Sequence, residues 1–524
     1  MKLRRLTPLL GLLLAGCGAS AHAPVPPRAT PEPALPEGPL DSLPPKNGTY
    51  PALYALQQAA ERRRRAAIAQ ARRSPTVPAA LSVARLTGRI TPAQEQRMRR
   101  EWTAANAVLA KLTGVRQTEL GYAVGSVNAL AAAHLLTADR LDPTFLVLNT
   151  NVRFWPGAAI PAAGWRTSFG NDPVIFQYYP GHGLQLQPLA SWGRANALAG
   201  ACLAAMRSRS SKDRCRSAAL TRSLDRLASL AAHRSGYLAW EYYFAYGSGA
   251  PPWVSGMTQA TAAQALSRGY RALGVKRWKR TALRSLGAFE QRSPRGVALP
   301  VPGGRHYLLY SFAPDHVVLN GGLQAVIGLR DTAALTHSRR AQQLFRAGDR
   351  AARREVAAFD TGAWSLYSSH GAESNLNYHE LLASFLAGLC DRVHVKVYCR
   401  THASFVRYER EPTRIGIRPL YKLRADHAAT VHFTLSKVSS VKVRVWGKRG
   451  MNLSRDYQLP RGGHSFAWVP PRRGTYKVRI EAQGPSGPVG VESRVLKVKL
   501  PKPHHKKKAA SRRKKHRDAG HRAP

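Results

Sequence analysis

The spacing of apolar residues follows a helical period over most of the chain and a strand period near its end. Residues 50–133 are rich in Ala, Leu and Arg, a pattern that predicts helices. From about Asn149 to Arg410, apolar helical runs alternate with loops that carry Gly, Pro and many aromatic residues. Helices joined by such loops fit an (α/α) toroid, in which the loops form a cleft at one end. We therefore predict a mainly α, toroid-like domain over residues 50–410.

Several helices can be placed individually within this domain. Thr91 followed by Pro92 indicates an N-cap with proline in the first helical turn. The helices that precede residue 135 are expected to cap the toroid. Further helices are predicted at Leu198–Met206, Gln259–Leu273, Leu323–Leu329, Ala341–Ala358 and Tyr378–Leu389.

The apolar period changes to two after the helical domain. In Val441–Val445 apolar and basic residues alternate, as in a strand with one buried face. Thr475–Ile480 and Val495–Val498 repeat this pattern, and Gly-Gly and Pro-Pro turns separate the runs. Residues 411–500 therefore predict a small all-β sandwich of immunoglobulin-like type. The charged run at residues 501–524 is expected to be a disordered basic tail.

The first residues have the pattern of an export signal. Two arginines and a lysine in Met1–Arg5 precede a short apolar run, Leu9–Leu14, which is too short to span a bilayer. The tetrapeptide Leu14–Cys17 resembles the lipobox of bacterial lipoproteins, so residues 1–17 are expected to be a signal peptide and Cys17 the lipidated residue. An ordinary secretory signal with an incidental cysteine is the alternative. Residues 18–49 are rich in Pro and Ala and predict an extended tether.

The other cysteines are even in number, and an exported chain is free to form disulfides from them. Local pairing of Cys202 with Cys215 and of Cys390 with Cys399 is favoured because each pair is close in sequence. Three connectivities are possible, and buried free thiols are a further alternative. The sequence contains no Cys-x-x-Cys spacing, so we predict no metal site and no cofactor.

The formal net charge of +51 indicates an acidic partner. Ten Lys and Arg residues lie between Lys502 and Arg522, and another cluster covers Arg62–Arg65. Nucleic acid would suit this charge, but the export signal argues against it. An acidic glycan or an anionic envelope suits both the charge and a location outside the cytoplasm, with the lipid holding the chain at the cell membrane.

Four segments combine Tyr, His, Asn and Gly at junctions between loops and helices: Phe176–Gln185, Tyr310–Gly321, Phe359–Tyr367 and Asn377–His379. Aromatic rings stack on sugar rings, and amide groups hydrogen-bond to sugar hydroxyls, so these segments predict a carbohydrate site. The alternative is that the rings fill gaps between helices. The expected substrate-binding residues are Tyr179, His182, Gln185, Gln259, Asn320, His370 and His379.

The order and spacing of several sequence blocks resemble the C-terminal domain of the D-glucuronyl C5-epimerases. The resemblance is clearest over residues 250–408. The blocks are Ser255–Ala260, Arg268–Tyr270, Tyr310 with Val318–Gly321, Gly328–Asp331, Leu344–Gly348, Asp360–Gly362, Leu366-Tyr367 and Tyr378-His379.

This resemblance implies inversion at C5 of a hexuronic acid within a polysaccharide. One group would remove the C5 proton, which is α to the carboxylate, and a second would deliver a proton to the opposite face. The catalytic tyrosines of the family fall on Tyr310, Tyr367 and Tyr378. A tyrosine of ordinary pKa, near 10, is a poor base at neutral pH but donates a proton well.

Two positions depart from the family pattern. Leu309 stands where the family has an acidic residue expected to act as a base, and His370 replaces an Arg expected to meet the substrate carboxylate. Glu373 is the first candidate for the missing base, with Asp315 and His370 behind it. The sequence therefore supports two hypotheses: an exported epimerase (or a lyase acting through the same carbanion), and a non-catalytic binder of acidic envelope glycans. Retention of Tyr310, Tyr367 and Tyr378 favours the first, and Leu309 favours the second.

Overall fold

The computed structural model describes residues 51–207 and 215–499, which fall into two compact units. The first unit contains the chain up to Thr361 together with Ser365–Ser404, and the second contains Gly362–Trp364 and the chain from Phe405 onward. The predicted signal peptide with Cys17, the tether and the basic tail lie outside the described residues. Within the described ranges, no helix is both long and apolar enough to cross a membrane.

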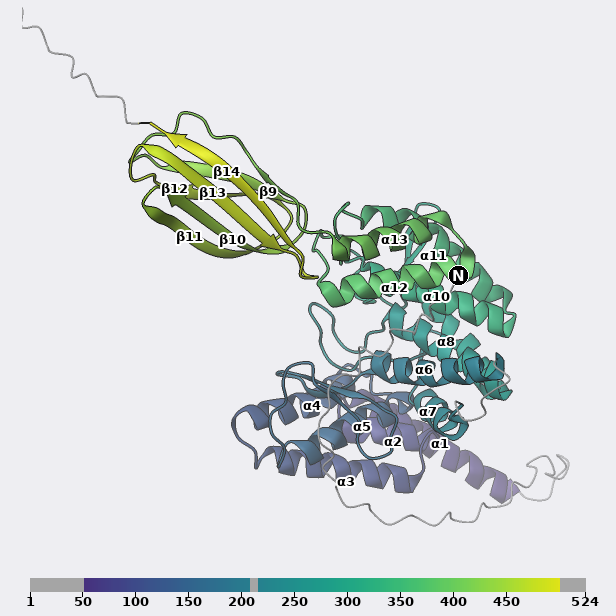
Figure 1. The fold of residues 1–524 in the computed structure, drawn as a ribbon. Helices are drawn as coiled ribbons and strands as arrows, with labels where there is room; N and C mark the ends of the chain where they lie inside the picture. Colours follow the sequence, from purple (N-terminus) through teal and green to yellow (C-terminus); the bar gives the residue numbers. More distant parts are fainter. Residues whose placement is uncertain (1–50, 208–214, 500–524) are drawn as a thin grey trace, which may run out of the picture. The chain divides into compact units, whose positions relative to one another are not determined.

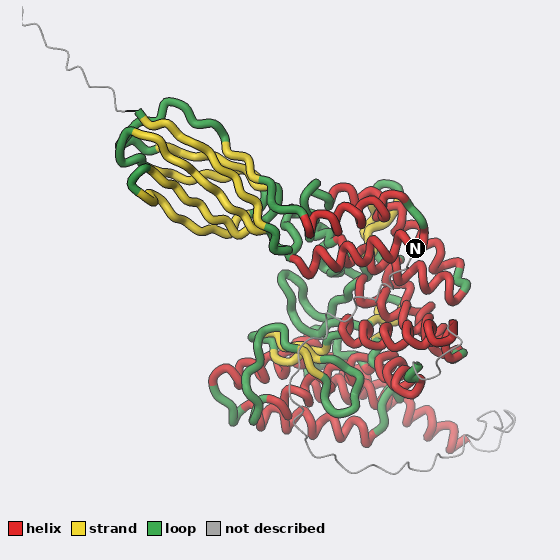
Figure 2. Tube along the Cα trace, viewed as in Figure 1, coloured by secondary structure: helices red, strands yellow, loops and turns green. Residues whose placement is uncertain are grey.

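The first unit is built mainly from helices (Figures 1 and 2). The N-terminal group is α1 (Pro51–Arg73), α2 (Val77–Leu86), α3 (Pro92–Leu109), α4 (Gly114–Ala132) and α5 (Ala138–Phe154). After it come α6 (Pro188–Arg207), α7 (Ser217–Ser229), α8 (Gly256–Leu273), α9 (Lys276–Ser285), η3 (Leu286–Phe289), α10 (Leu319–Thr336), α11 (Arg339–Ala358), α12 (Leu376–Val393) and α13 (Lys396–Arg410).

Short antiparallel strands connect these helices. A three-stranded sheet consists of β1 (Arg166–Thr167), β2 (Phe176–Tyr179) and β3 (Gly183–Leu186). Two hairpins follow, one of β4 (Ala232–Arg234) with β5 (Tyr237–Ala239), and the other of β6 (Ala298–Val301) with β7 (Gly304–Tyr307). The prediction of a mainly helical domain is confirmed. Closure of its helices into a toroid stays a prediction.

The helices predicted from the apolar period are present, and several extend beyond the predicted runs. The five predicted runs lie in α6, α8, α10, α11 and α12. At α3, Thr91 forms a capping box, because its Oγ1 accepts from the Gln94 amide at 3.2 Å and its own amide donates to Gln94 Oε1 at 2.7 Å. Pro92 occupies the first turn, where a missing amide hydrogen costs little. The local signal was therefore sufficient to fix this helix start.

Helices α6, α8, α10 and α12 lie in succession (Figure 1), and a buried carboxylate links three of them. Asp331 on α10 accepts from Arg268 of α8 at 2.7 Å and from Arg392 of α12 at 2.9 Å. The side chain of Gln264, one turn before Arg268, also donates to it, at 2.7 Å. Burial opposes ionisation of Asp331, but the guanidinium groups of Arg392 and Arg268 outweigh it and hold the pKa of the carboxyl below its ordinary value.

Two disulfides join residues close in sequence. Cys202 is bonded to Cys215 and Cys390 to Cys399, with Cα–Cα distances of 4.2 and 5.0 Å. These are the two local pairs that the sequence favoured among its alternatives. The second links α12 to α13, so it fixes the turn between these helices.

The second unit contains two antiparallel sheets that share one apolar core. One sheet has the order β11 (Gly450–Leu459), β10 (Ser439–Gly447), β13 (Gly474–Gln483) and β14 (Val489–Val498). The other has the order β12 (Gly462–Trp468), β9 (Ala429–Leu435) and β8 (Ile415–Ile417). Along β9 and most of β10, buried and more exposed positions alternate. The predicted β region is confirmed, and its immunoglobulin-like type stays a prediction.

A buried lysine supports the start of this unit. Lys437, between β9 and β10, is 1% exposed, and its Nζ donates to the carbonyl oxygens of Tyr408 at 2.6 Å and Glu411 at 2.8 Å. The same ammonium lies 5.1 Å from the ring centroid of Trp364. These contacts place the end of α13 and residues 362–364 in the same unit as the sheets.

Candidate functional site

Three tyrosines that are far apart in sequence meet in the first unit. Tyr310 follows β7, Tyr367 lies in the segment before α12, and Tyr378 occupies the first turn of that helix. Tyr310 and Tyr367 lie close enough to affect each other's pKa, and the ring centroids of Tyr367 and Tyr378 are 4.7 Å apart. Tyr378 is 40% exposed, so the group reaches the surface.

Backbone contacts hold the two loops that carry these rings. Val318 forms an isolated antiparallel bridge with Ser368, and the Ser369 amide donates to the Val317 carbonyl at 2.9 Å. In return, the Val317 amide donates to Ser369 Oγ at 3.2 Å. Further along, the cap residue Asn375 accepts from the amide of Tyr378 at 2.9 Å. The positions of the three rings are therefore fixed by pairing of the loops and by a helix cap.

Two histidines lie beside the tyrosines. Nδ1 of His316 is 3.0 Å from Nδ1 of His370. The ring centroid of His316 is 6.4 Å from that of Tyr310 and 6.4 Å from that of Tyr367. His370 was predicted from the sequence as a site residue, whereas His316 was not, although it lies inside the segment Tyr310–Gly321.

The environment changes the acidity of these groups in opposite directions. Burial, followed by the nearby hydroxyls of Tyr367 and Tyr246, raises the pKa of Tyr310 well above its ordinary value. Burial, followed by Tyr378, raises the pKa of Tyr367 to about 12. Burial, reinforced by His370, lowers the pKa of His316. At neutral pH, Tyr310 and Tyr367 are therefore protonated, while His316 is neutral.

A continuous set of ring contacts, here called the aromatic tract, extends from these tyrosines to the β2–β3 hairpin. Its centre is a cluster of Tyr242, Phe244 and Trp253, against which Tyr122, Tyr179, Tyr310 and Phe312 pack. The centroid of Trp253 lies 5.8 Å from that of Tyr310, and the centroid of Phe244 lies 4.6 Å from that of Tyr179. His182 adjoins the same end, 5.9 Å from Phe244. The predicted sugar-contacting residues Tyr179 and His182 thus share one tract with the three tyrosines.

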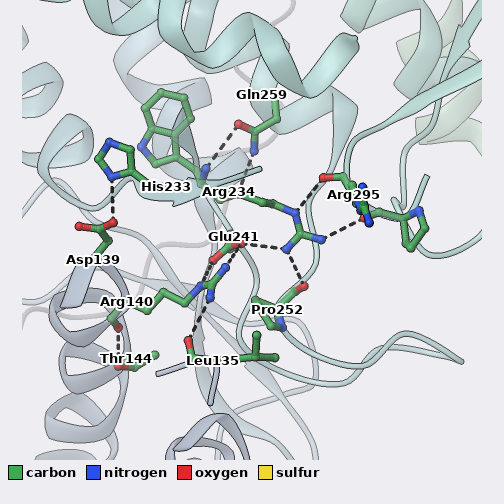
Figure 3. Close-up of polar contacts among 12 residues, drawn as sticks. Leu135, Asp139, Arg140, Thr144, His233, Arg234, Glu241, Pro252, Gln259 and Arg295 are labelled. Carbon is green, nitrogen blue, oxygen red and sulfur yellow. Dashed lines mark hydrogen bonds and ion pairs between the residues drawn. The ribbon is translucent and has the colours of Figure 1, made fainter. Parts of the chain in front are cut away.

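A buried ion-pair network supports the segment that carries the centre of the tract (Figure 3). The carboxylate of Glu241 accepts from Arg140 Nε at 2.7 Å and from Arg234 Nη1 at 2.9 Å, and its side chain is fully buried. Arg234 also donates to the carbonyl oxygen of Pro252 at 3.1 Å. Since Glu241 directly precedes Tyr242 and Pro252 directly precedes Trp253, the network holds both ends of the aromatic segment.

One comparison with known proteins covers the region that carries the tyrosines. Residues 234–406 match the family model described as D-glucuronyl C5-epimerase C-terminus. A D-glucuronyl C5-epimerase of Caenorhabditis elegans is 28% identical over 162 residues, which are 26% of this chain and 26% of that protein. The resemblance predicted from the sequence is thereby confirmed for this region.

A second relative is an uncharacterized protein of Methanocaldococcus jannaschii, 23% identical over 172 residues. That match covers 31% of this chain and 56% of the relative. The chain therefore spans about a quarter of the first curated relative and about half of the second.

Solved structures with a detectable likeness include two sugar epimerases and a mannanase. A cellobiose 2-epimerase from Spirochaeta thermophila has a TM-score of 0.33 and 14% identity, covering 56% of this chain and 73% of its own. A sugar epimerase from a ruminal bacterium has a TM-score of 0.34 and 9% identity, and the likeness covers 57% of this chain and 75% of that protein. The GH76 α-mannanase from Bacteroides thetaiotaomicron has a TM-score of 0.31 and 10% identity, and the likeness covers 43% of this chain and 61% of that protein.

The position at which the C5-epimerase family has its acidic residue is filled by an apolar contact. Leu309 is only partly exposed, and its side chain lies against Gly321 at the start of α10, where an added Cβ would come within 2.9 Å of the Leu309 Cβ. Glu373 is half-buried, and its backbone bridges Leu366, the residue before Tyr367. Asp315 is exposed and directly precedes His316.

Several residues predicted to bind substrate instead hold the protein together. Gln259 is fully buried, and its amide group donates to the Trp240 carbonyl at 2.9 Å and accepts from the Trp240 amide at 3.4 Å (Figure 3). Gln185 is 1% exposed and donates to the carbonyl of His182 at 2.5 Å. His379 is fully buried, with its Nδ1 2.8 Å from Ser365 Oγ. These residues position the loops, and their burial does not favour the sugar contact predicted from the sequence.

Asn320 is a further residue that the sequence predicted to bind substrate. It lies in the first turn of α10 directly before Gly321, and it is 3% exposed. Its Oδ1 has no hydrogen-bond partner among the described residues. It lies too deep for the direct sugar contact predicted from the sequence.

A cavity of about 390 Å³ opens elsewhere in the first unit, between β7 and α11. Its lining includes Arg305, Arg340 and Arg350 and shares no residue with the aromatic tract. Arg340 pairs with Glu290 at 2.5 Å, and Arg350 donates to the carbonyl of Gly303 at 2.7 Å. Two of its three guanidinium groups are therefore already engaged within the protein.

Proposed function

We propose that this protein is a carbohydrate epimerase that inverts C5 of hexuronic acid residues within an acidic polysaccharide. The observation that carries the proposal is the convergence of Tyr310, Tyr367 and Tyr378, which lie in three separate family blocks, into one group at the end of the aromatic tract. The match of residues 234–406 to the C5-epimerase family supports the same reaction.

The proposed chemistry fits the protonation states of this group. The C5 hydrogen of a uronate is α to a carboxylate, so its removal leaves charge that spreads onto the carboxylate oxygens. A tyrosine that is protonated at neutral pH, as Tyr367 is with a pKa of about 12, serves as the acid that returns a proton to the opposite face. At the exposed side of the tyrosine group, Tyr378 and Tyr246, which are 40% and 42% exposed, offer ring faces and edges for neighbouring sugars of the polymer.

The test is exchange of the C5 hydrogen with solvent. The full-length protein would be incubated in heavy water with a panel of polysaccharides that contain glucuronate or other uronates. We expect deuterium at C5, detected by NMR and mass spectrometry, together with the inverted sugar. Absence of deuterium at C5 throughout the panel would contradict the proposed function. An unsaturated C4–C5 product would instead indicate the related lyase.

A non-catalytic glycan binder is the second candidate, and Leu309 favours it because the family's acidic residue is missing at that position. This reading predicts binding of uronate polymers that is sensitive to loss of tract aromatics, with no C5 exchange. Calorimetry with the same polysaccharides, run beside the exchange assay, separates the two functions.

The proposed location is outside the cytoplasm, with the chain attached to the cell membrane through a lipid on Cys17. The lipobox-like tetrapeptide and the Pro-rich tether support this location. The substrate would then be an exported, acidic envelope polysaccharide. A net charge of +51 suits such a polymer.

A further inference from the structure

The proposed reaction lacks an assigned base for removal of the C5 proton. The family's acidic residue is replaced by Leu309, whose side chain cannot accept a proton. Tyr310 and Tyr367 keep their protons at neutral pH, so they are poor bases. A different group within reach of the three tyrosines must therefore perform the abstraction.

We propose that His316 is the base that removes the C5 proton, and that His370 positions it. This inference rests on the proposed function. It names the residue that would remove the C5 proton in place of the family's acidic group. His316 adjoins both Tyr310 and Tyr367, with its ring centroid 6.4 Å from each, and its Nδ1 lies 3.0 Å from Nδ1 of His370. The proposed base therefore lies in the same cluster of rings as the proposed acids.

The contact between the two imidazoles engages Nδ1 of His316 and leaves Nε2 as the nitrogen available to react. Two ring nitrogens 3.0 Å apart share one hydrogen, with one nitrogen donating and the other accepting. When Nδ1–H of His316 donates to the bare Nδ1 of His370, the lone pair of His316 is on Nε2. This is the tautomer that the proposal requires. The arrangement has the same logic as a general base held by a hydrogen-bonded orienting partner.

The surroundings of His316 keep it in the neutral form that a base needs. The titratable groups that face it are His370, Tyr310 and Tyr367. Burial, and then the second imidazole, lower the pKa of His316 below its ordinary value of 6.5. The base form therefore persists from neutral pH down to mildly acidic pH. Asp315 is exposed, and its backbone carbonyl is occupied by the Ser369 hydroxyl at 3.4 Å.

The step balances without any further reactant. The C5–H bond breaks, its proton forms an N–H bond at Nε2 of His316, and the electron pair is delocalised into the substrate carboxylate. The imidazolium is stabilised by its Nδ1–H bond to His370. Tyr367 or Tyr378 then gives its hydroxyl proton to the opposite face of C5. The phenolate and the imidazolium return to their starting states by proton exchange with water.

The test compares variants of the full-length chain in the C5 exchange assay. His316→Gln is expected to lower the exchange rate by about 10²-fold or more, while calorimetry shows unchanged polysaccharide affinity. In His316→Ala, added imidazole is expected to restore part of the exchange, whereas it does nothing for Tyr367→Phe. His432→Gln, at an exposed position of β9 in the second unit, serves as the matched control and should behave as wild type.

Two readouts separate a base from a merely structural residue. The exchange rate in wild type should fall as pH drops through the lowered pKa of His316, and in the imidazole-rescued His316→Ala the acidic limb should instead follow the titration of free imidazole. Nitrogen NMR of labelled histidine should show a bare Nε2 and a protonated Nδ1 on His316 in the free protein.

Each failure has a distinct meaning. If wild type exchanges C5 hydrogen and His316→Gln retains a rate within about threefold, His316 is not the base and the proposed function stands. The opposite tautomer, with Nε2 protonated and Nδ1 bare, would also overturn the assignment of the base. If wild type exchanges the C5 hydrogen of no polysaccharide in the panel, both the proposed function and the assignment of His316 as its base are contradicted.

Discussion

At the level of single residues, the surroundings of each ring decide which proton it holds. Tyr310 and Tyr367 are buried among other phenols, which disfavours a phenolate and makes both rings proton donors. His316 is partly buried beside a second imidazole, which disfavours the imidazolium. Acid and base are therefore separated by environment, although a carboxylate is missing from the position where the family has one.

The first prediction concerns the proton donors. Tyr367→Phe and Tyr378→Phe each remove a hydroxyl while keeping the ring, so both are expected to lower epimerisation by about 10²-fold or more with little change in fold. Tyr421→Phe, at a position that is 80% exposed in the second unit, is the matched control. Product analysis by NMR measures the rate. Full activity in both site variants would remove these tyrosines from the mechanism.

At the level of secondary-structure elements, the helices of the first unit are joined by polar contacts as well as by apolar packing. Asp331 links α8, α10 and α12 through Arg268 and Arg392. Gly328, one turn earlier on α10, faces Ala260 of α8, where an added Cβ would come within 2.6 Å of the Ala260 carbonyl oxygen. Three of the family blocks, Ser255–Ala260, Arg268–Tyr270 and Gly328–Asp331, therefore contribute to the packing of α8 and α10.

The second prediction concerns this carboxylate. Asp331→Asn leaves two largely buried guanidinium groups without a counter-charge, so it is expected to destabilise the first unit by on the order of 3 kcal/mol. Glu61→Gln, which breaks an exposed pair with Arg65 on α1, should change stability by less than about 1 kcal/mol. Urea unfolding followed by tryptophan fluorescence measures both. Equal effects of the two substitutions would show that the link is unimportant.

The same carboxylate gives a pH dependence with a definite sign. Its pKa in the folded chain lies below the ordinary value of 3.8, so the unfolded chain binds this proton first as pH falls. The stabilisation is therefore fully present above about pH 4 and is lost as pH drops through the folded pKa. In Asp331→Asn, this part of the acid destabilisation should be absent from the unfolding curves.

At the level of the whole molecule, the proposed function makes charge and the predicted anchor the features expected to govern how the protein meets its substrate. The formal net charge is +51, and part of it comes from the run Lys502–Arg522, outside the described residues. Long-range attraction between a cationic protein and an anionic polymer raises the association rate and is screened by salt.

The third prediction follows from this charge. Association with a uronate polysaccharide, measured by stopped-flow fluorescence, should slow several-fold between about 0.05 and 0.5 M salt. Removal of residues 502–524 should reduce this salt dependence and leave the rate of C5 exchange at saturating substrate unchanged. A rate that is independent of salt would show that the charge does not steer the substrate.

The fourth prediction concerns the anchor. Cys17→Ser removes the thiol that would carry the lipid, so the chain is expected in the soluble fraction and should no longer incorporate labelled fatty acid. Cys202→Ser, which breaks a disulfide of the first unit, should leave the fatty-acid label in place. Retention of the label in Cys17→Ser would refute lipidation at this residue.

The sequence by itself determined features that depend on short-range chemistry. The helical and strand periods located both regions, because side-chain spacing follows directly from backbone geometry. Thr91 and Pro92 fixed a helix start, because a cap is formed within one turn. The order of the family blocks identified Tyr310, Tyr367 and Tyr378 as a set before their positions in space were known.

Only the tertiary structure decided which residues meet and which are buried. His316 and His370 are 54 positions apart, so their contact results from pairing of two loops that no local pattern encodes. Gln259 and His379 have the composition of binding residues, but both are fully buried because their helices pack at those turns. Depth and long-range proximity depend on the whole fold, and they separate the side chains that face a substrate from those that support them.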